Sequence, residues 1–315
     1  MQQALSRREF AVATAMIASK ATLNQAQLAD DLPIIDTHQH LWDLRRLRLK
    51  WIGKGGILDR NYLPDDFAEA TAGLGLAQAV YMEVAVVPED QTAEAKWVSD
   101  LCASKSGPTR SAIISGQPGS DGFVKYLDQF KGNPYIKGLR CGVQTEPAKP
   151  GKVISTNFMK GIQELGRRNL SFDLNMGGDD LETGLQLVEA CPDTRFILDH
   201  CGNPDVRQKP SEKWLKGIDR LAGKPNVSAK ISGIIARVDK AKPLVPQLMP
   251  FVNHVWQAFG PDRVVFGGDW PVCLSGGTYA QWVRALREIA SQRSAEDRRK
   301  LFHDNALRVY RLDRV

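Results

Sequence analysis

The 315-residue sequence lacks the motifs that mark several classes of protein. Its five cysteines form no C-x-x-C pair and leave at least one unpaired, which argues against a disulfide scaffold and against a structural zinc motif of that kind. No G-x-G-x-x-G follows the first apolar run and no Walker loop occurs, so the usual nucleotide-binding signals are missing. The net charge of +6 is modest and the basic residues are scattered, which argues against nucleic acid as a partner and leaves anionic small molecules open.

The first thirty residues differ in character from the rest. The segment Ser6–Phe10, with the letters SRREF, precedes a mildly apolar run from Ala11 to Ser19, and a polar stretch from Lys20 to Asp30 follows. This order resembles a twin-arginine export signal, so we expect the protein to be periplasmic or otherwise exported. A disordered tail on a cytoplasmic protein is the alternative, because a lysine interrupts the apolar region. The run is far shorter than the roughly 20 residues that span a bilayer, so we expect no membrane span.

Beyond residue 30 the chain alternates short apolar runs with helical stretches. Eight of the runs are rich in β-branched and aromatic residues, as strands are. They are Ile34–Asp36, Ala79–Val84, Ser111–Ser115, Ile136–Leu139, Leu170–Leu174, Arg195–Leu198, Val227–Ile231 and Val264–Phe266. Alternating strands and helices in this number predict an α/β fold, a (β/α)8 TIM barrel, as a single domain over residues 31–315. An open doubly wound sheet is the runner-up.

Helical stretches fill the spaces between the strands. The predicted helices are Asp65–Leu74, Gln91–Cys102, Gly122–Phe130, Asn157–Arg168, Leu181–Ala190, Lys213–Leu221, Pro246–Phe259 and Tyr279–Ala290. The segment Ser294–Val315 predicts extra C-terminal helices, the last capped by Asp304-Asn305, that pack outside the barrel. The segment Asp43–Pro64 mixes basic residues, glycine and Trp51, which predicts a loop over the C-terminal mouth of the barrel.

The stretch PIIDTHQH, residues 33–40, contains the first candidate site. Ile34 and Ile35 predict a short buried strand that runs into polar residues without a turn. Alternate side chains of a strand share a face, so His38 and His40 should point the same way. Two imidazoles at the end of a buried strand suit a divalent metal, or a carbonyl oxygen that needs two hydrogen-bond donors.

Polar residues at the other strand ends extend this site. Catalytic groups of a TIM barrel come from the C-terminal ends of different strands. The residues at these ends are His38 and His40 on the first strand, Glu83 on the second, Arg140 on the fourth, Asp199-His200 on the sixth and Asp269 on the eighth. His254 and His303 lie in helical stretches instead. The Gly267-Gly268 pair before Asp269 indicates that the backbone there approaches another group closely.

The motifs at these positions resemble those of the amidohydrolase superfamily, specifically its lactonase branch of fuconolactonases, rhamnonolactonases and pyrone-dicarboxylate lactonases. The resemblance covers most of the chain from Pro33 to Tyr310. It rests on DTHQHLW, MEVAVVPED, IKGLR, ILDHCGNP, AKISG and VVFGGDWPV. It implies a TIM barrel whose functional residues are His38, His40, His200 and Asp269, with Arg140 as a substrate clamp.

The resemblance also bears on metal content. Binuclear members have a bridging carboxylated lysine near the end of strand four or five and another histidine on strand five, whereas these strands end here in Arg140 and Asn175. We therefore expect no two-metal centre. One zinc would be satisfied by three imidazoles and a carboxylate, yet a catalytic zinc also needs an open position and a base. We expect no required cofactor; the alternative is one divalent ion, zinc, held by His38, His40, His200 and Asp269.

The expected reaction is hydrolysis of a sugar-acid or dicarboxylate lactone. Asp269 takes a proton from the attacking water, while the imidazoles stabilise the oxyanion and help to protonate the leaving alkoxide. Arg140 either orients the substrate or forms a salt bridge to Glu83. Glu83 would accept hydrogen bonds from substrate hydroxyls. Lys230, on the seventh strand, lines the same mouth only if its side chain points inward, which the sequence does not decide.

Two other functions stay open, namely a zinc-dependent decarboxylase of the same superfamily and a solute-binding barrel without turnover. Asp269 facing three histidines favours an enzyme, because a binding protein for a neutral sugar would gain nothing from burying a potential base. The expected partner is a small-molecule lactone. A homo-oligomer is left open by the sequence.

Overall fold

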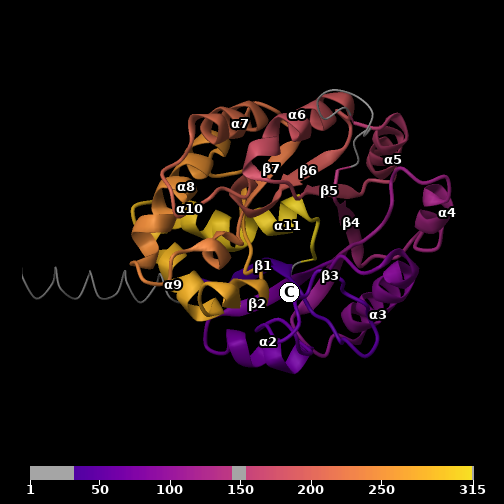
Figure 1. Cartoon of the computed structure of the whole chain (residues 1–315), viewed down its shortest axis with the longest axis horizontal. Helices are drawn as coiled ribbons and strands as arrows, with labels where there is room; N and C mark the ends of the chain where they lie inside the picture. Colours follow the sequence, from indigo (N-terminus) through magenta and orange to yellow (C-terminus); the bar gives the residue numbers. More distant parts are fainter. Residues whose placement is uncertain (1–31, 144–153, 314–315) are drawn as a thin grey trace, which may run out of the picture.

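The computed structural model describes residues 32–143 and 154–313, and a ring of eight parallel strands forms its centre (Figure 1). The strands follow one another around the ring in chain order. They are β1 (Ile34–Gln39), β2 (Leu76–Met82), β3 (Thr109–Ile114), β4 (Ile136–Cys141), β5 (Ser171–Leu174), β6 (Arg195–Leu198), β7 (Val227–Ile231) and β8 (Val264–Phe266). The twin-arginine-like segment lies outside the described residues.

Contacts between the ends of β1 and β8 close the ring. The Asp269 amide donates to the His38 carbonyl at 2.8 Å, and the His40 amide donates to the Trp270 carbonyl at 2.7 Å. The chain just after β8 therefore pairs with the end of β1, whereas an open sheet would leave two free edges. The predicted barrel is confirmed, and the doubly wound sheet is excluded.

Helices surround the ring on its outside (Figure 1). They are α2 (Pro64–Thr71), α3 (Gln91–Ser104), α4 (Phe123–Asp128), α5 (Thr156–Arg167), α6 (Leu181–Ala190), α7 (Glu212–Ala222), α8 (Leu244–Phe259) and α9 (Tyr279–Ala290). Short 3-10 turns occur in several of the loops that follow the strands, as η1 (Pro88–Asp90), η2 (Gly178–Asp180), η3 (Asp199–Gly202), η4 (Ile234–Arg237) and η5 (Val272–Ser275). Within the described part of the chain, no helix combines the length and apolar character needed to cross a bilayer.

The predicted boundaries agree at β6, β7, β8, α6 and α9, and among the strands they differ most at the first two. β1 extends to Gln39, and a register shift against β2 lies between Asp36 and Gln39. Such a shift adds a residue to one strand and re-aims the side chains beyond it. Ile35 packs inside the barrel. Because of the bulge, His38 also reaches the interior, where simple alternation from Ile35 would have turned it outward.

The C-terminal segment corrects the predicted helix cap. It runs without a break through α10 (Ala295–Arg299), the π-helical turn η6 (Lys300–Asp304) and α11 (Asn305–Val309). Asp304 has helical backbone angles and makes no capping hydrogen bond. Its carboxylate pairs with Arg299 instead, at 3.0 Å. The prediction that Asp304-Asn305 caps the last helix was therefore wrong.

The same segment closes the barrel rather than packing outside it. In Figure 1, α11 lies over the centre of the ring. Ala306, Val309 and Tyr310 pack with Ile35 and Val265, which face the barrel interior. The N-terminal end of the barrel is lined by apolar side chains that would otherwise meet water, and burying them stabilises the fold by about 25 cal/mol per Å². The prediction of an outer position was wrong because helical pattern alone does not reveal which surface a helix covers.

Candidate active site

Asp36 connects the end of β1 to the loop after β8. Its fully buried carboxylate accepts hydrogen bonds through Oδ1 from the His38 amide at 2.8 Å and the Gly268 amide at 2.7 Å. Burial raises the pKa of Asp36, although the two amides partly offset that rise. Beyond this junction His38 and His40 face each other, with their Nε2 atoms 3.1 Å apart.

Asp269 meets the two imidazoles from the loop after β8. Its Oδ1 lies 3.3 Å from His40 Nε2 and 3.6 Å from His38 Nε2. Asp269 has a positive φ of 54°. A Cβ at the preceding Gly268 would lie 2.2 Å from the Tyr279 ring, so a side chain does not fit there. The close backbone approach that the glycine pair indicated is present.

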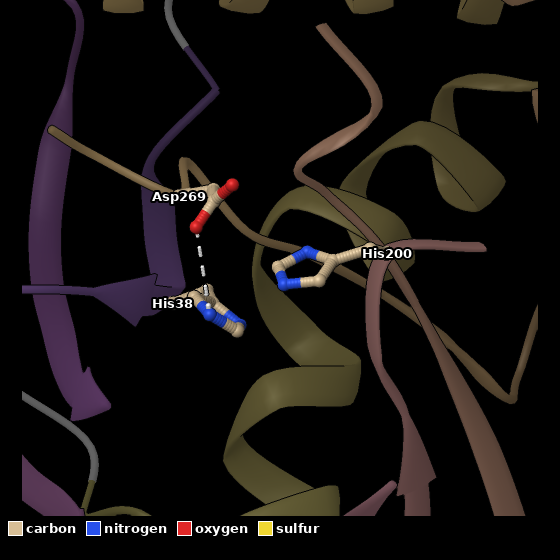
Figure 2. Close-up of side chains that lie close together, drawn as sticks. All are labelled: His38, His200 and Asp269. Carbon is tan, nitrogen blue, oxygen red and sulfur yellow. Dashed lines mark ion pairs between the residues drawn. The ribbon is translucent and has the colours of Figure 1, made fainter. Parts of the chain in front are cut away.

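His200 reaches the same place from the end of β6. His200, Cys201, Gly202 and Asn203 all have positive φ values between 52° and 70°, which makes a tight left-handed turn. Burial lowers the pKa of His200 and favours its neutral form. Figure 2 shows its imidazole facing His38 and Asp269.

The backbone of the next strand loop lies directly against the His200 ring. Its Nδ1 is 2.9 Å from Ser232 Oγ. A Cβ at Gly233 would lie 2.2 Å from the same nitrogen, and Gly233 has a φ of 66°. Only glycine fits this position, so the contact holds the imidazole in one orientation.

Arg140 is held by Glu83. Its Nε donates to Glu83 Oε1 at 2.6 Å and its Nη2 donates to the Glu83 carbonyl at 2.7 Å. Burial alone would lower the pKa of Arg140, but Glu83 and Asp199 raise it above its ordinary value. The salt bridge that the sequence offered as the alternative to a substrate clamp is therefore present. The remaining nitrogen, Nη1, lies 3.2 Å from His38 Nε2 and 3.4 Å from Asp199 Oδ2.

A buried ion cluster of Lys230, Asp173 and Asp199 lies beneath the histidines. Lys230 Nζ is 2.8 Å from Asp173 Oδ2 and 2.9 Å from Asp199 Oδ1, and all three residues are fully buried. Burial raises the pKa of Asp173 to about 6. Burial would also raise the pKa of Asp199, but Lys230 and His38 lower it well below its ordinary value.

Sequence reasoning did not find this ion cluster. Its signal was a charged residue inside an otherwise apolar strand, Asp173 in SFDL and Lys230 in VSAKI. Asp199 was noted at a strand end but given no role. The direction of each side chain depends on the barrel geometry, which places alternate residues inside.

A cavity of about 310 Å³ opens beside these groups. Four of the six predicted site residues contribute to its wall, whereas His38 and Glu83 are buried and do not line it. The lining residues are His40, Trp51, Val84, Ala85, Arg140, Asn175, His200, Asn203, Gly233, Ala236, Arg237, Asp269 and Val272. The wall thus combines a carboxylate, imidazoles and several polar donors.

Two parts of this wall come from loops. Trp51 donates through its indole nitrogen to the Val84 carbonyl at 2.7 Å, which places the 43–64 insertion at the mouth of the barrel, as predicted. Arg237, which the sequence pattern did not single out, donates to Asn203 Oδ1 at 3.0 Å. The only sequence feature that could have identified Arg237 is its place in the loop after the seventh strand.

The donor groups of this site suit a single metal ion only in part. His38, His200 and Asp269 each offer one ligand atom, and these atoms lie within 4.8 Å of one another, which suits a single ion in size. A metal-binding imidazole usually donates its other N–H to a carboxylate, carbonyl or water. His40 Nδ1 lies 2.9 Å from the Met82 carbonyl and meets this condition. At His38 Nδ1, Lys230 Nζ lies at 3.1 Å, nearer than the Asp199 carboxylate at 3.5 Å, so this condition is met poorly.

Comparison with known proteins gives consistent matches. The model of the amidohydrolase family matches residues 35–312. An L-fucono-1,5-lactonase of Burkholderia multivorans is 28% identical over 292 residues, covering 88% of this chain and 96% of that protein. An L-rhamnono-gamma-lactonase of Scheffersomyces stipitis is 22% identical over 337 residues, covering 89% and 98%. A crystal structure of an amidohydrolase from Burkholderia multivorans with bound zinc has a TM-score of 0.79 at 24% identity, covering 89% of this chain and 100% of that one.

Proposed function

This chain belongs to the amidohydrolase family, and we propose that it opens a lactone ring by general-base attack of water. One observation carries the proposal: the Asp269 carboxylate borders a 310 Å³ cavity together with His40, His200 and Arg140. A carboxylate in that position is within reach of a water held against a bound carbonyl carbon. The lactonase names of two similar proteins support the choice of a cyclic ester.

The proposed reaction needs one base, one oxyanion donor and one orienting group. Asp269 takes a proton from water as the water oxygen bonds to the carbonyl carbon. His200 donates from Nε2 to the developing oxyanion, its Nδ1 being engaged by Ser232. When the tetrahedral intermediate collapses, the bond from carbon to the ring oxygen breaks and the leaving alkoxide takes the proton from Asp269. All protons are then accounted for within the site.

The cavity wall favours a hydroxylated or carboxylated lactone. Asn175, Asn203 and Arg237 supply amide and guanidinium groups to the wall of the cavity. Such donors and acceptors suit the hydroxyls of a sugar acid or the carboxylates of a dicarboxylate. Arg140 would contribute only its Nη1, because Glu83 occupies its other two nitrogens.

The proposal requires no metal ion. The imidazole of His38, a candidate zinc ligand, is flanked by two cationic groups. Arg140 Nη1 lies 3.2 Å from its Nε2, and Lys230 Nζ lies 3.1 Å from its Nδ1. Nearby positive charge disfavours binding of a divalent cation. A single zinc ion at His38, His200 and Asp269 is the alternative, and it would polarise the carbonyl in place of His200.

The experiment is a hydrolysis screen on five- and six-membered sugar-acid lactones and a pyrone dicarboxylate. The release of acid measures the opening of the ring. Asp269→Asn is the matched control. Proton release by the wild type and none by the variant is expected. Carbon dioxide release from an aromatic carboxylate would instead indicate the decarboxylase, and calorimetric binding of a sugar without turnover would indicate the solute-binding barrel; either result without lactone opening contradicts the proposal.

A further inference from the structure

The ammonium group of Lys230 is surrounded by two carboxylates and one imidazole. Its Nζ donates to Asp173 Oδ2 at 2.8 Å, lies 3.1 Å from His38 Nδ1 and forms an ion pair with Asp199 Oδ1 at 2.9 Å. The side chain is fully buried, so no water competes for these contacts. Tyr310 supports the arrangement, because its hydroxyl donates to Asp173 and its ring centre lies 5.3 Å from Nζ. An ammonium group can only donate hydrogen bonds.

This contact fixes which nitrogen of His38 carries the proton. A neutral imidazole has one N–H and one lone pair. Since Lys230 donates to Nδ1, the lone pair is there and the proton is on Nε2. Burial and the charge of Lys230 lower the pKa of His38 well below its ordinary value, which disfavours a second proton on the ring.

The partners of Nε2 support the same tautomer. His40 Nδ1 donates to the Met82 carbonyl at 2.9 Å, and its Nε2 lies 3.3 Å from Asp269 Oδ1. His40 Nε2 also lies 3.1 Å from His38 Nε2, and one of these two nitrogens must donate to the other. Asp269 Oδ1, an acceptor, lies 3.6 Å from His38 Nε2. A proton on His38 Nε2 can be donated to His40 Nε2 or to Asp269 Oδ1.

The opposite tautomer satisfies a contact with Arg140 and a longer one with Asp199. Arg140 Nη1 lies 3.2 Å from His38 Nε2 and would donate to a lone pair there. Arg140 has a second acceptor for that nitrogen in Asp199 Oδ2 at 3.4 Å. Moving the proton to Nδ1 would turn an N–H toward the Lys230 ammonium, and its other acceptor, Asp199 Oδ1, is 3.5 Å away. The contacts of Lys230 with Nδ1 and of Asp269 with Nε2 thus favour the proton on Nε2, whereas those of Arg140 with Nε2 and of Asp199 with Nδ1 oppose it. The Lys230 contact decides, because an ammonium group can only donate.

We propose that Lys230 is a positioning residue that holds the single imidazole proton of His38 on Nε2, directed at His40 and Asp269, and so prevents His38 from ligating zinc. This role rests on the proposed function only in one respect, namely that Asp269, toward which the proton is directed, is the general base. A zinc ligand must offer a lone pair. Zinc on His38 Nε2 would therefore drive the proton to Nδ1, against the ammonium group. His40, whose other nitrogen faces a carbonyl, has no such obstacle.

The first test uses the unaltered protein. Histidine labelled with ¹⁵N gives five imidazole patterns, one per histidine, and a His38→Gln spectrum identifies the pattern of His38. At a pH where histidine is neutral, we expect His38 to show a protonated Nε2 and an unprotonated Nδ1. The reverse pattern would overturn the proposal, and no substitution of Lys230 is needed to obtain it.

The second test removes the ammonium group. In Lys230→Met, the His38 proton is free to move to Nδ1 and donate to Asp199, so equilibrium dialysis against zinc chloride should show binding at least about tenfold tighter than in the wild type. Lys137→Met, at a half-buried lysine at the start of β4, is the control and should leave zinc affinity unchanged. If the unpaired Asp173 prevents folding, Lys230→Met with Asp173→Asn serves instead. Equal zinc binding by the folded variant and the control would overturn the proposal.

Neither readout depends on turnover. If the protein opens no lactone but shows protonated Nε2 and tighter zinc binding on loss of Lys230, the proposed function fails and the role of Lys230 stands. If lactones are opened while His38 shows protonated Nδ1, the role of Lys230 fails alone.

Discussion

Glu83 accepts two hydrogen bonds from Arg140, one through its side chain and one through its backbone. Oε1 lies 2.6 Å from Nε, and the carbonyl oxygen lies 2.7 Å from Nη2. The second carboxylate oxygen of Glu83 accepts from the Ala85 amide at 2.7 Å, so the glutamate is itself fixed. Arg140 therefore borders the cavity in a set orientation, with one nitrogen, Nη1, that Glu83 does not engage. A bound ring between Arg140 and Asp269 would have its position defined by that nitrogen.

Arg140→Lys tests this orientation. Lysine keeps the charge but loses the planar fork, so it cannot contact Glu83 twice and also reach substrate. We expect KM for the opened lactone to rise by the equivalent of about 1–3 kcal/mol, a smaller fall in kcat, and a lower free energy of unfolding. Steady-state kinetics and urea denaturation measure the two effects. Arg45→Lys, an exposed arginine, is the control. An unchanged KM with lowered stability would make Arg140 a structural residue only.

Removal of metal tests the proposal that no ion is required. Because two cationic groups flank His38, we expect protein dialysed against a chelator to keep most of its lactonase activity. Zinc content should be measured on the same samples, with dialysis against buffer alone as the control. Activity that is lost with the zinc and restored by one equivalent per chain would establish the single-zinc alternative.

Tyr310→Phe tests the contact between the C-terminal segment and the ion cluster. The variant loses the hydrogen bond to Asp173 Oδ2, 2.6 Å long and fully buried. A hydrogen bond to a charged acceptor contributes about 1.5–3 kcal/mol, and one to a neutral acceptor about 1 kcal/mol. Tyr126→Phe removes a bond to the Ser115 carbonyl and is the comparison. We expect the larger loss of unfolding free energy for Tyr310→Phe; equal losses would mean that Asp173 is not charged there.

Local pattern predicted the barrel but not its interior. β6, β7 and β8 are short apolar runs with clear ends, so their boundaries followed from composition alone. The strand-end rule assembled His40, Arg140, His200 and Asp269 around one cavity. It could not resolve the direction of Lys230, because that depends on the barrel geometry and on which residues the other strands present.

Local sequence pattern also could not predict how distant segments of the chain pack together. The C-terminal helix was predicted, yet its position was wrong, because Tyr310 reaches an aspartate 137 residues away in the chain. The bulge in β1 depends on register against β2, which one strand's sequence does not contain. Both features involve pairs of distant segments, and both set the surroundings of His38.

Glu94→Gln tests a buried carboxylate outside the catalytic cavity. Glu94 accepts hydrogen bonds from Tyr81 and from the Val84 amide, and burial raises its pKa from 4.5 to about 7. Between these values the folded protein binds more protons than the unfolded chain, so this group's contribution to stability is lost as pH rises toward 7. Glutamine carries no such proton. We expect the unfolding free energy of the variant minus that of the wild type to increase by about 1–3 kcal/mol from pH 4.5 to pH 8. Glu69→Gln, at an exposed site, should show no such trend.

Asp269→Asn separates catalysis from folding at the centre of the site. Asparagine has the same shape, and its amide can donate to His40 Nε2, which lies 3.3 Å from the Asp269 oxygen. The variant should therefore keep the wild-type unfolding free energy within about 1 kcal/mol. It cannot accept a proton from water, so kcat should fall by roughly 10² to 10⁴, the usual contribution of a positioned base. KM should change less, because the groups that contact the ground-state lactone remain. A folded variant that keeps more than about a tenth of the wild-type kcat would exclude Asp269 as the base and require a search for another acceptor, with His40 Nε2 first.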